Sequence, residues 1–126
     1  MRRLMLIAAV ALLGTSGCGD QPDSSSNTAS NPVSINALHA YKSDLENTVV
    51  LAVRRGQSKD ELRRQIGLVA NRHGLDDWES VEESFVAIGV GLRAAEANDE
   101  VAESIATLVS GGDTVRRQLV LDAYGR

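Results

Sequence analysis

Hydrophobic residues form two kinds of pattern along this chain. Near its start, an unbroken apolar run extends over residues 4–13. From residue 34 onward, apolar residues instead recur every three or four positions, which is the period of an amphipathic helix. The second pattern predicts one all-α domain over residues 35–126.

The first two predicted helices are separated by Gly56. The first covers about residues 34–55, and its apolar stripe consists of Leu38, Tyr41, Leu45, Val49 and Ala52. Ser58 and Glu61 have the spacing of a capping box, so we expect the second helix to begin there. Its end is expected near Gly74, because glycine readily adopts the left-handed conformation that terminates helices.

The third predicted helix carries the most regular pattern in the chain. Asp76 and Glu79 again have capping-box spacing, so we expect Asp76 to be its cap. Its apolar seam has alternating spacings of three and four and consists of Trp78, Val81, Phe85, Ile88, Leu92 and Ala95. This heptad spacing predicts a continuous helix over residues 76–95.

The middle of that helix, residues 85–92, contains no polar side chain. We therefore expect neighbours on more than one side of it. A parallel stripe of small residues, Ser84, Ala87, Gly91 and Ala94, would let another helix approach closely. Gly89 and Gly91 are read as close-packing positions rather than as a hinge. Alternation within the segment also permits a buried strand, but the seam continues on both sides and favours a helix.

Two shorter helices are predicted at the end of the chain, over Asp99–Ser110 and Asp113–Tyr124. Gly111 and Gly112 separate them. Short loops between amphipathic helices are typical of antiparallel neighbours. The predicted fold is therefore a small antiparallel bundle of four to five helices.

The apolar run near the start lies in a recognisable context. Arg2 and Arg3 precede it, small residues fill positions 14–17, and Cys18 follows as the only cysteine. The run is about half of the roughly 20 residues that a membrane-spanning helix needs. This stretch resembles a bacterial lipoprotein signal peptide with a lipobox ending at Cys18, although Thr15 stands where leucine is usual.

The resemblance implies cleavage before Cys18, which would remove the signal peptide, residues 1–17. Cys18 would then carry S-diacylglycerol and, in many bacteria, an N-acyl chain, so its membrane partner is the lipid bilayer. We accordingly expect a lipid-anchored protein of the bacterial cell membrane or outer membrane, facing the periplasm or the exterior. The alternative is a secreted protein with a free thiol at Cys18.

The segment between the predicted anchor and the predicted domain is polar. Residues 18–34 are rich in serine and asparagine and include Pro22 and Pro32. Such a composition buries too little apolar area to offset the entropy of ordering, so we expect a flexible linker.

The charge balance and the cysteine content bear on the kind of partner and on disulfide formation. Without residues 1–17 the chain has 11 basic and 17 acidic side chains, a net charge of −6, which disfavours nucleic acid as a partner. The single cysteine excludes an internal disulfide. Basic residues concentrate in residues 54–72 and acidic residues in 76–103. We read these as solvated faces that attract each other across helices, with a partner-steering patch as the alternative.

Candidate chemistry is sparse, and we predict no catalytic, cofactor-binding or metal-binding residues. His73 with Asp76 and Asp77 is the one conceivable metal cluster, but a histidine beside a helix end is more often a cap or surface residue. His39 is likewise expected at the surface. Glu79, Glu82 and Glu83 are expected to form a solvated acidic face, and Trp78 and Phe85 to belong to the core.

These observations favour a non-enzymatic, membrane-anchored adaptor that binds another envelope protein. Its outline is similar to that of secretin pilotins, helical lipoproteins that bind a disordered tail of a pore subunit in a groove, although the paired cysteines of some pilotins are absent. Immunity or exclusion lipoproteins fit equally well. Two alternatives remain: an envelope protein that binds or converts a small ligand near His73, and a structural homo-oligomer formed through the Trp78–Ala95 seam.

Overall fold

The computed structural model describes residues 34–125, and all regular structure in this range is helical. Its α-helices are α2 (Ile35–Arg54), α3 (Lys59–Arg72), α4 (Glu82–Ala94), α5 (Asp99–Ser110) and α6 (Thr114–Gly125), and a short 3-10 helix, η3 (Trp78–Ser80), precedes α4. The predicted all-α bundle is confirmed. The predicted signal peptide (residues 1–17) and all but the last residue of the predicted linker (residues 18–34) lie outside the described residues.

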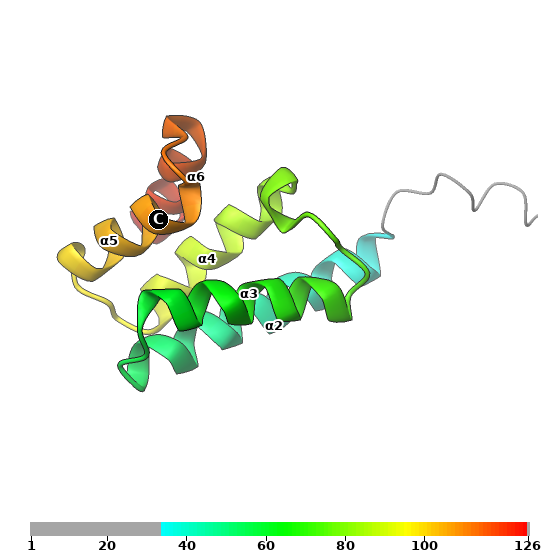
Figure 1. The fold of residues 1–126 in the computed structure, drawn as a ribbon, viewed down its shortest axis with the longest axis horizontal. Helices are drawn as coiled ribbons and strands as arrows, with labels where there is room; N and C mark the ends of the chain where they lie inside the picture. Colours follow the sequence, from blue (N-terminus) through cyan, green and yellow to red (C-terminus); the bar gives the residue numbers. More distant parts are fainter. Residues whose placement is uncertain (1–33, 126) are drawn as a thin grey trace, which may run out of the picture. The chain divides into compact units, whose positions relative to one another are not determined.

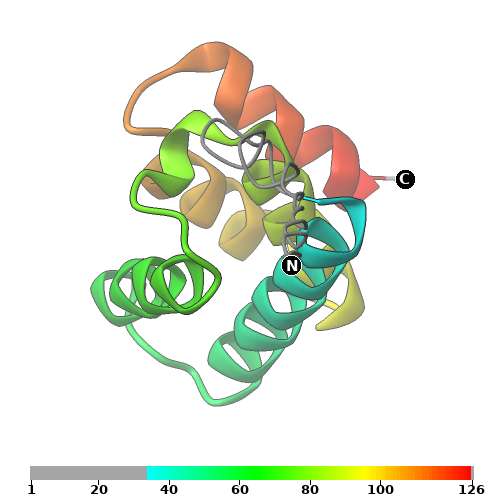
Figure 2. The same ribbon diagram turned by 90° about the vertical axis from the view of Figure 1, so that its right-hand side faces the viewer.

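Helix α4 is the centre of the bundle. It packs against α2 on one side and α6 on the other, while α3 packs on α2 and α5 packs on α6 (Figures 1 and 2). The predicted apolar stripes form the core. Its largest fully buried apolar side chains include Tyr41, Leu45 and Val49 from α2 and Phe85, Ile88 and Leu92 from α4. The predicted helical, rather than extended, conformation of residues 85–92 is thereby confirmed.

Two glycines let α4 approach both neighbours closely. A Cβ atom at Gly89 would lie 2.3 Å from the carbonyl oxygen of Val120 in α6. A Cβ atom at Gly91 would lie 2.8 Å from Cβ of Val49 in α2. Real Cβ atoms do not come so near to other heavy atoms, so only glycine permits this spacing. The expectation of close helix packing at both positions is confirmed.

The predicted continuous helix over residues 76–95 is wrong. Val81 is extended (φ −105°, ψ 113°), and it separates η3 from α4. In one straight helix, Trp78 and Phe85 would be about 10 Å apart along the axis. The break instead brings their ring centroids to 5.7 Å, so that both rings are buried together in the core.

Most of the helix ends lie close to where the sequence predicted them. The Ser58 hydroxyl accepts a hydrogen bond from the Glu61 amide, and Gly74 has a positive φ of 79°. The Glu61 carboxylate does not complete the capping box, because it accepts two hydrogen bonds from Arg64. The predicted cap at Asp76 is wrong, since η3 begins after Asp77, which makes no side-chain capping hydrogen bond.

Among residues 34–125, none of the helices is both long and apolar enough to cross a membrane.

Candidate functional site

The residues that the sequence singled out do not assemble into a reactive site. Cys18, the predicted lipid-attachment residue, lies outside the described residues. His39 is exposed, as expected. His73 contacts Asp44 of α2 through Nε2 at 2.7 Å, and its side chain is only 19% exposed. Within residues 34–125 there is no group of three histidine, cysteine or acidic side chains that would hold a metal ion.

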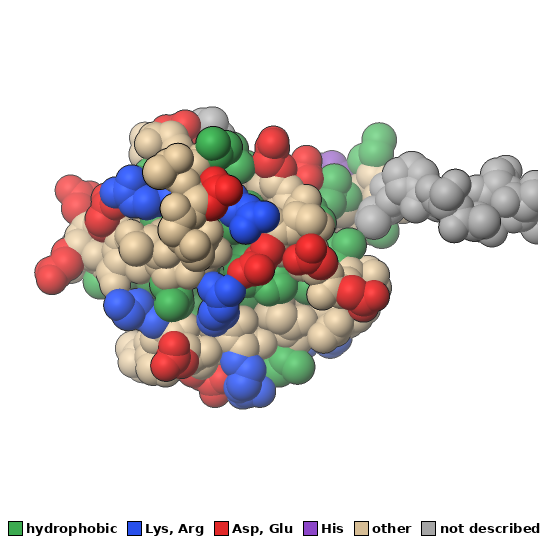
Figure 3. Space-filling model, turned by 45° about the horizontal axis from the view of Figure 1, so that its top comes forward, with side chains coloured by type: hydrophobic (Ala, Val, Ile, Leu, Met, Phe, Trp, Pro, Cys, Tyr) green, Lys and Arg blue, Asp and Glu red, His purple; other side chains and the backbone are tan. Residues whose placement is uncertain are grey.

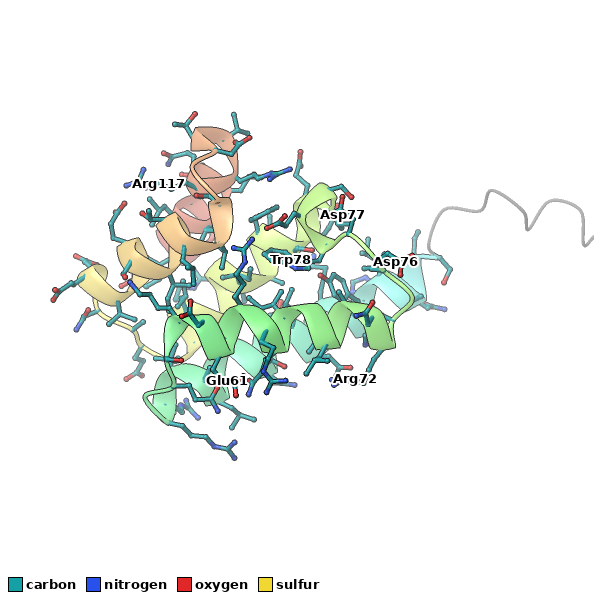
Figure 4. The ribbon with its side chains drawn as sticks, viewed as in Figure 1. Glu61, Arg72, Asp76, Asp77, Trp78 and Arg117 are labelled. Carbon is teal, nitrogen blue, oxygen red and sulfur yellow. The ribbon has the colours of Figure 1, made fainter. Side chains whose placement is uncertain are left out.

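Asp76 and Asp77 lie on the segment that leads from α3 into η3, and the next residue, Trp78, points inward between α3 and α4 (Figure 4). His73 instead pairs with Asp44, which comes from another helix. The sequence did not reveal the His73–Asp44 contact, because it joins residues 29 positions apart through the packing of α3 on α2.

A buried polar pair lies beside that histidine. The Tyr41 hydroxyl and the Ser84 hydroxyl are 2.6 Å apart, and both residues are fully buried. The His73 ring stands edge-on to the Tyr41 ring, with centroids 5.7 Å apart. Burial raises the pKa of Tyr41, and its hydrogen bond with Ser84 partly opposes this. Because Ser84 is inaccessible and is bonded to tyrosine rather than histidine, this arrangement provides no nucleophile for a substrate.

One acidic residue of the third predicted helix, Glu79, has a structural partner. Glu79 forms an ion pair with Arg63 of α3, whose guanidinium also lies 5.6 Å from the centroid of the Trp78 ring. This contact joins the basic segment to the acidic one, as the charge pattern predicted. In contrast, Glu61 and Arg72 lie on the edge of α3 that faces away from α4 (Figure 4).

Helices α3 and α5 meet through two cationic side chains. Lys59 Nζ donates to Ser104 Oγ at 2.7 Å, and Arg63 donates to the carbonyl oxygen of Leu108 at 3.0 Å. Both contacts join residues 45 positions apart, so α3 and α5 run in the same direction here. The antiparallel arrangement predicted for helices joined by short loops does not apply to this pair. Arg63 also satisfies a carbonyl near the end of α5, where the helix dipole favours a cation.

A groove lies beside these contacts, and we call it the α3–α5 groove. It consists of two adjoining hollows of about 480 and 510 Å³, which share Lys59, Glu100 and Ser104. The first hollow lies between the end of α2 and α5, and its apolar lining includes Ala52, Val53, Leu62, Val101 and Ile105. The second continues along α5 past Thr107 and Leu108. On the face shown in Figure 3, charged side chains of both signs lie among hydrophobic ones.

The groove resembles ordinary ligand sites in its size and in the mixed character of its lining. Each hollow falls in the size range of ordinary ligand sites, and its lining combines apolar side chains with a few polar groups. Its charged side chains are Lys59 from α3 and Glu100 and Glu103 from α5, and neither His73 nor Asp76 or Asp77 lines it. The histidine and the aspartates that the sequence singled out therefore lie outside this groove.

One polar residue of the groove was missed by sequence reasoning. Gln57 follows Gly56 in the turn between α2 and α3, and its Oε1 atom is buried without a hydrogen-bond donor among the described residues. In the sequence, Gly56 and Gln57 indicate only a turn. The placement of Gln57 opposite α5 depends on the packing of helices distant in sequence, so no local signal marks it.

Comparison with known proteins identified no family model that matches this chain, and no curated protein or solved structure that matches it.

Proposed function

We propose that this protein is a lipid-anchored protein of the bacterial cell envelope that binds another envelope protein and catalyses no reaction. The anchor rests on the pattern of residues 1–18, in which two arginines, a short apolar run and small residues precede Cys18. The binding role rests on the α3–α5 groove, whose first hollow combines apolar side chains with a few polar ones and shares lining residues with the second.

We choose a protein rather than a small molecule as the partner because of the length of the groove. Its α5 wall extends from Glu100 to Leu108, which corresponds to roughly 12 Å along a helix. A compact small molecule fills one hollow, whereas a polypeptide segment occupies both. A partner that displays such a segment in the envelope would be held near the bilayer by a lipid on Cys18.

A small-ligand-binding role is the second candidate, and the volume of the first hollow, about 480 Å³, favours it. This ligand would occupy the hollow beside Leu62 and Ile105 rather than the surroundings of His73. The homo-oligomer alternative loses its proposed surface. Phe85, Ile88 and Leu92 of the Trp78–Ala95 seam are at most 1% exposed, because they pack inside the bundle.

Mass spectrometry of the protein crosslinked in its own membranes tests both parts of the proposal. We expect an N-terminal peptide that begins with acylated Cys18, together with one dominant crosslinked envelope protein. The Cys18→Ala variant is the control, and we expect it to lose the acylated peptide and to leave the membrane fraction. An unmodified N-terminus would contradict the anchor, and an absence of enriched neighbours would contradict the adaptor role.

A further inference from the structure

Two leucines are exposed on the same side of helices α2 and α3. Leu51 of α2 is 48% exposed, and Leu68 of α3 is 45% exposed. Leu68 lines a hollow between the two helices together with Thr48 of α2 and Gln65 of α3. Leu51 follows Thr48 by three residues, so it lies on the same side of α2. Both apolar side chains therefore belong to one outer surface of the helix pair.

Two arginines border these leucines. The Arg55 amide donates to the carbonyl oxygen of Leu51 at 3.0 Å, so Arg55 lies one helical turn beyond it. Arg72 follows Leu68 by four residues and lies on the edge of α3 that faces away from α4 (Figure 4). Both arginines are exposed, and neither forms an ion pair within residues 34–125. We call Leu51, Arg55, Leu68 and Arg72 the α2–α3 face.

The acidic residues on the same sides of these helices are paired. The Glu61 carboxylate of α3 accepts two hydrogen bonds from Arg64, and Asp44 of α2 contacts His73 at 2.7 Å. The two arginines of the α2–α3 face have no such partner. The face thus has unpaired positive charge, although the chain without residues 1–17 has a net charge of −6. An anionic surface complements a face of this kind.

An anionic phospholipid bilayer suits both components of the face. Leucines next to arginines are typical of segments that lie in the bilayer interface, where apolar side chains enter the acyl boundary and guanidinium groups bind phosphates. The predicted lipid on Cys18 would hold the domain beside a bilayer. Residues 19–33 are the predicted linker between them, and a flexible chain of this length spans about 20 Å. This proximity favours the bilayer over an acidic protein as the occupant.

We propose that the α2–α3 face rests on an anionic phospholipid bilayer, with its two leucines in the interface and its two arginines on lipid phosphates. This inference rests on the lipid anchor of the proposed function and goes beyond it, because it specifies the orientation of the domain at the membrane. None of the four residues lines the α3–α5 groove, so the bilayer and a protein partner would use different residues.

A photoreactive leucine analogue tests this orientation. The full chain, purified from its own membranes, carries the analogue in place of Leu68 or, as the control, in place of Val115. Val115 is 67% exposed but lies on α6, which packs against α4 and α5. Each protein is reconstituted in vesicles of phosphatidylcholine alone or of an equal mixture of phosphatidylcholine and phosphatidylglycerol. Mass spectrometry then quantifies the lipid adducts at each position.

We expect lipid adducts from position 68 in the anionic vesicles and several-fold fewer in the neutral ones. Position 115 should yield few adducts in either. Arg72→Gln should lower the yield from position 68 in anionic vesicles by up to about fivefold, the effect of one arginine near an anionic surface. Arg93→Gln is the matched control, because Arg93 is exposed on α4 and lies outside the α2–α3 face, and it should leave that yield unchanged.

Equal yields from positions 68 and 115, or a yield from position 68 that is the same in both kinds of vesicle, would overturn the proposal. Adducts between two copies of the chain in place of lipid adducts would also overturn it and would assign the face to self-association. A dominant protein adduct from position 68 in native membranes would assign it to a protein partner instead. The mass of the N-terminal peptide reports the anchor separately, so lipid adducts at position 68 with an unmodified Cys18 would contradict the proposed anchor alone.

Discussion

The contacts of α4 and the junction between α3 and α5 are built in opposite ways. Helix α4 meets α6 and α2 so closely that Gly89 and Gly91 leave no room for a side chain. Helices α3 and α5 instead touch through the long side chains of Lys59 and Arg63, with a groove beside them. Small residues exclude a ligand from the first region, whereas polar cross-contacts leave a partly apolar hollow in the second. The two regions differ in that the helices of the first meet without a gap, whereas a groove remains between those of the second.

The largest effect should come from filling the tight contact of α4. Gly89→Ala places a Cβ atom against the backbone of Val120, which cannot turn aside, and we expect a loss of about 3 kcal/mol in the free energy of unfolding. Gly67→Ala in α3 is the matched control, since a Cβ atom there meets nothing within 4 Å and should gain up to about 1 kcal/mol from helix propensity. Urea unfolding followed by circular dichroism measures both. Equal effects of the two substitutions would contradict the tight packing of α4.

The next effect concerns the buried polar pair in the α2–α4 contact. Ser84→Ala leaves the fully buried Tyr41 hydroxyl without its partner, and we expect a loss of about 2 kcal/mol. The double variant Tyr41→Phe with Ser84→Ala removes both hydroxyls and should recover most of that loss. A double-mutant cycle of unfolding free energies checks this, and strictly additive losses would show that the two hydroxyls do not depend on each other.

A smaller effect is expected at the α3–α5 junction. Arg63→Met removes the hydrogen bond to Leu108, the ion pair with Glu79 and the contact with Trp78. Because Arg63 is partly exposed, we expect a loss of only about 1–1.5 kcal/mol. Arg64→Met, which breaks an exposed pair with Glu61, should cost about 0.3–0.5 kcal/mol. Thermal unfolding measures the stability of both variants. An equal decrease in the two would show that Arg63 stabilises the protein no more than Arg64 does.

The smallest effect has the opposite sign. Gln57→Met removes a buried acceptor that lacks a donor, so the free protein should become more stable by up to about 1 kcal/mol. Unfolding free energies without ligand provide the measurement, with Gln65→Met as the control. A clear destabilisation by Gln57→Met would mean that Oε1 is already satisfied in the free protein.

The sequence predicted the parts of the fold that depend on local pattern. The helix over Asp99–Ser110 was predicted with its observed bounds, and Ser58 and Gly74 behave as expected. The break at Val81 was missed because it serves a tertiary contact, the packing of Trp78 on Phe85, while the heptad spacing continued through it.

The sequence predicted less of the candidate site than of the fold. Residues Gln57, Lys59 and Ile105 come from a turn and two helices, and their spatial relation depends on how α3 and α5 pack. Lysine and arginine at positions 59 and 63 were recognised as part of a basic segment. Their partners, Ser104 and a backbone carbonyl, carry no charge and so left no sign in the charge pattern.

Site-specific photo-crosslinking in the native envelope tests the central claim most directly. A photoreactive residue replaces Val101, which is 36% exposed at the groove, or Leu51, which is 48% exposed on α2 and is not among the residues that line the groove. We predict one dominant envelope-protein adduct from position 101 and none of that adduct from position 51. The same adducts from both positions, or none from position 101, would contradict the assignment of the α3–α5 groove as the binding site.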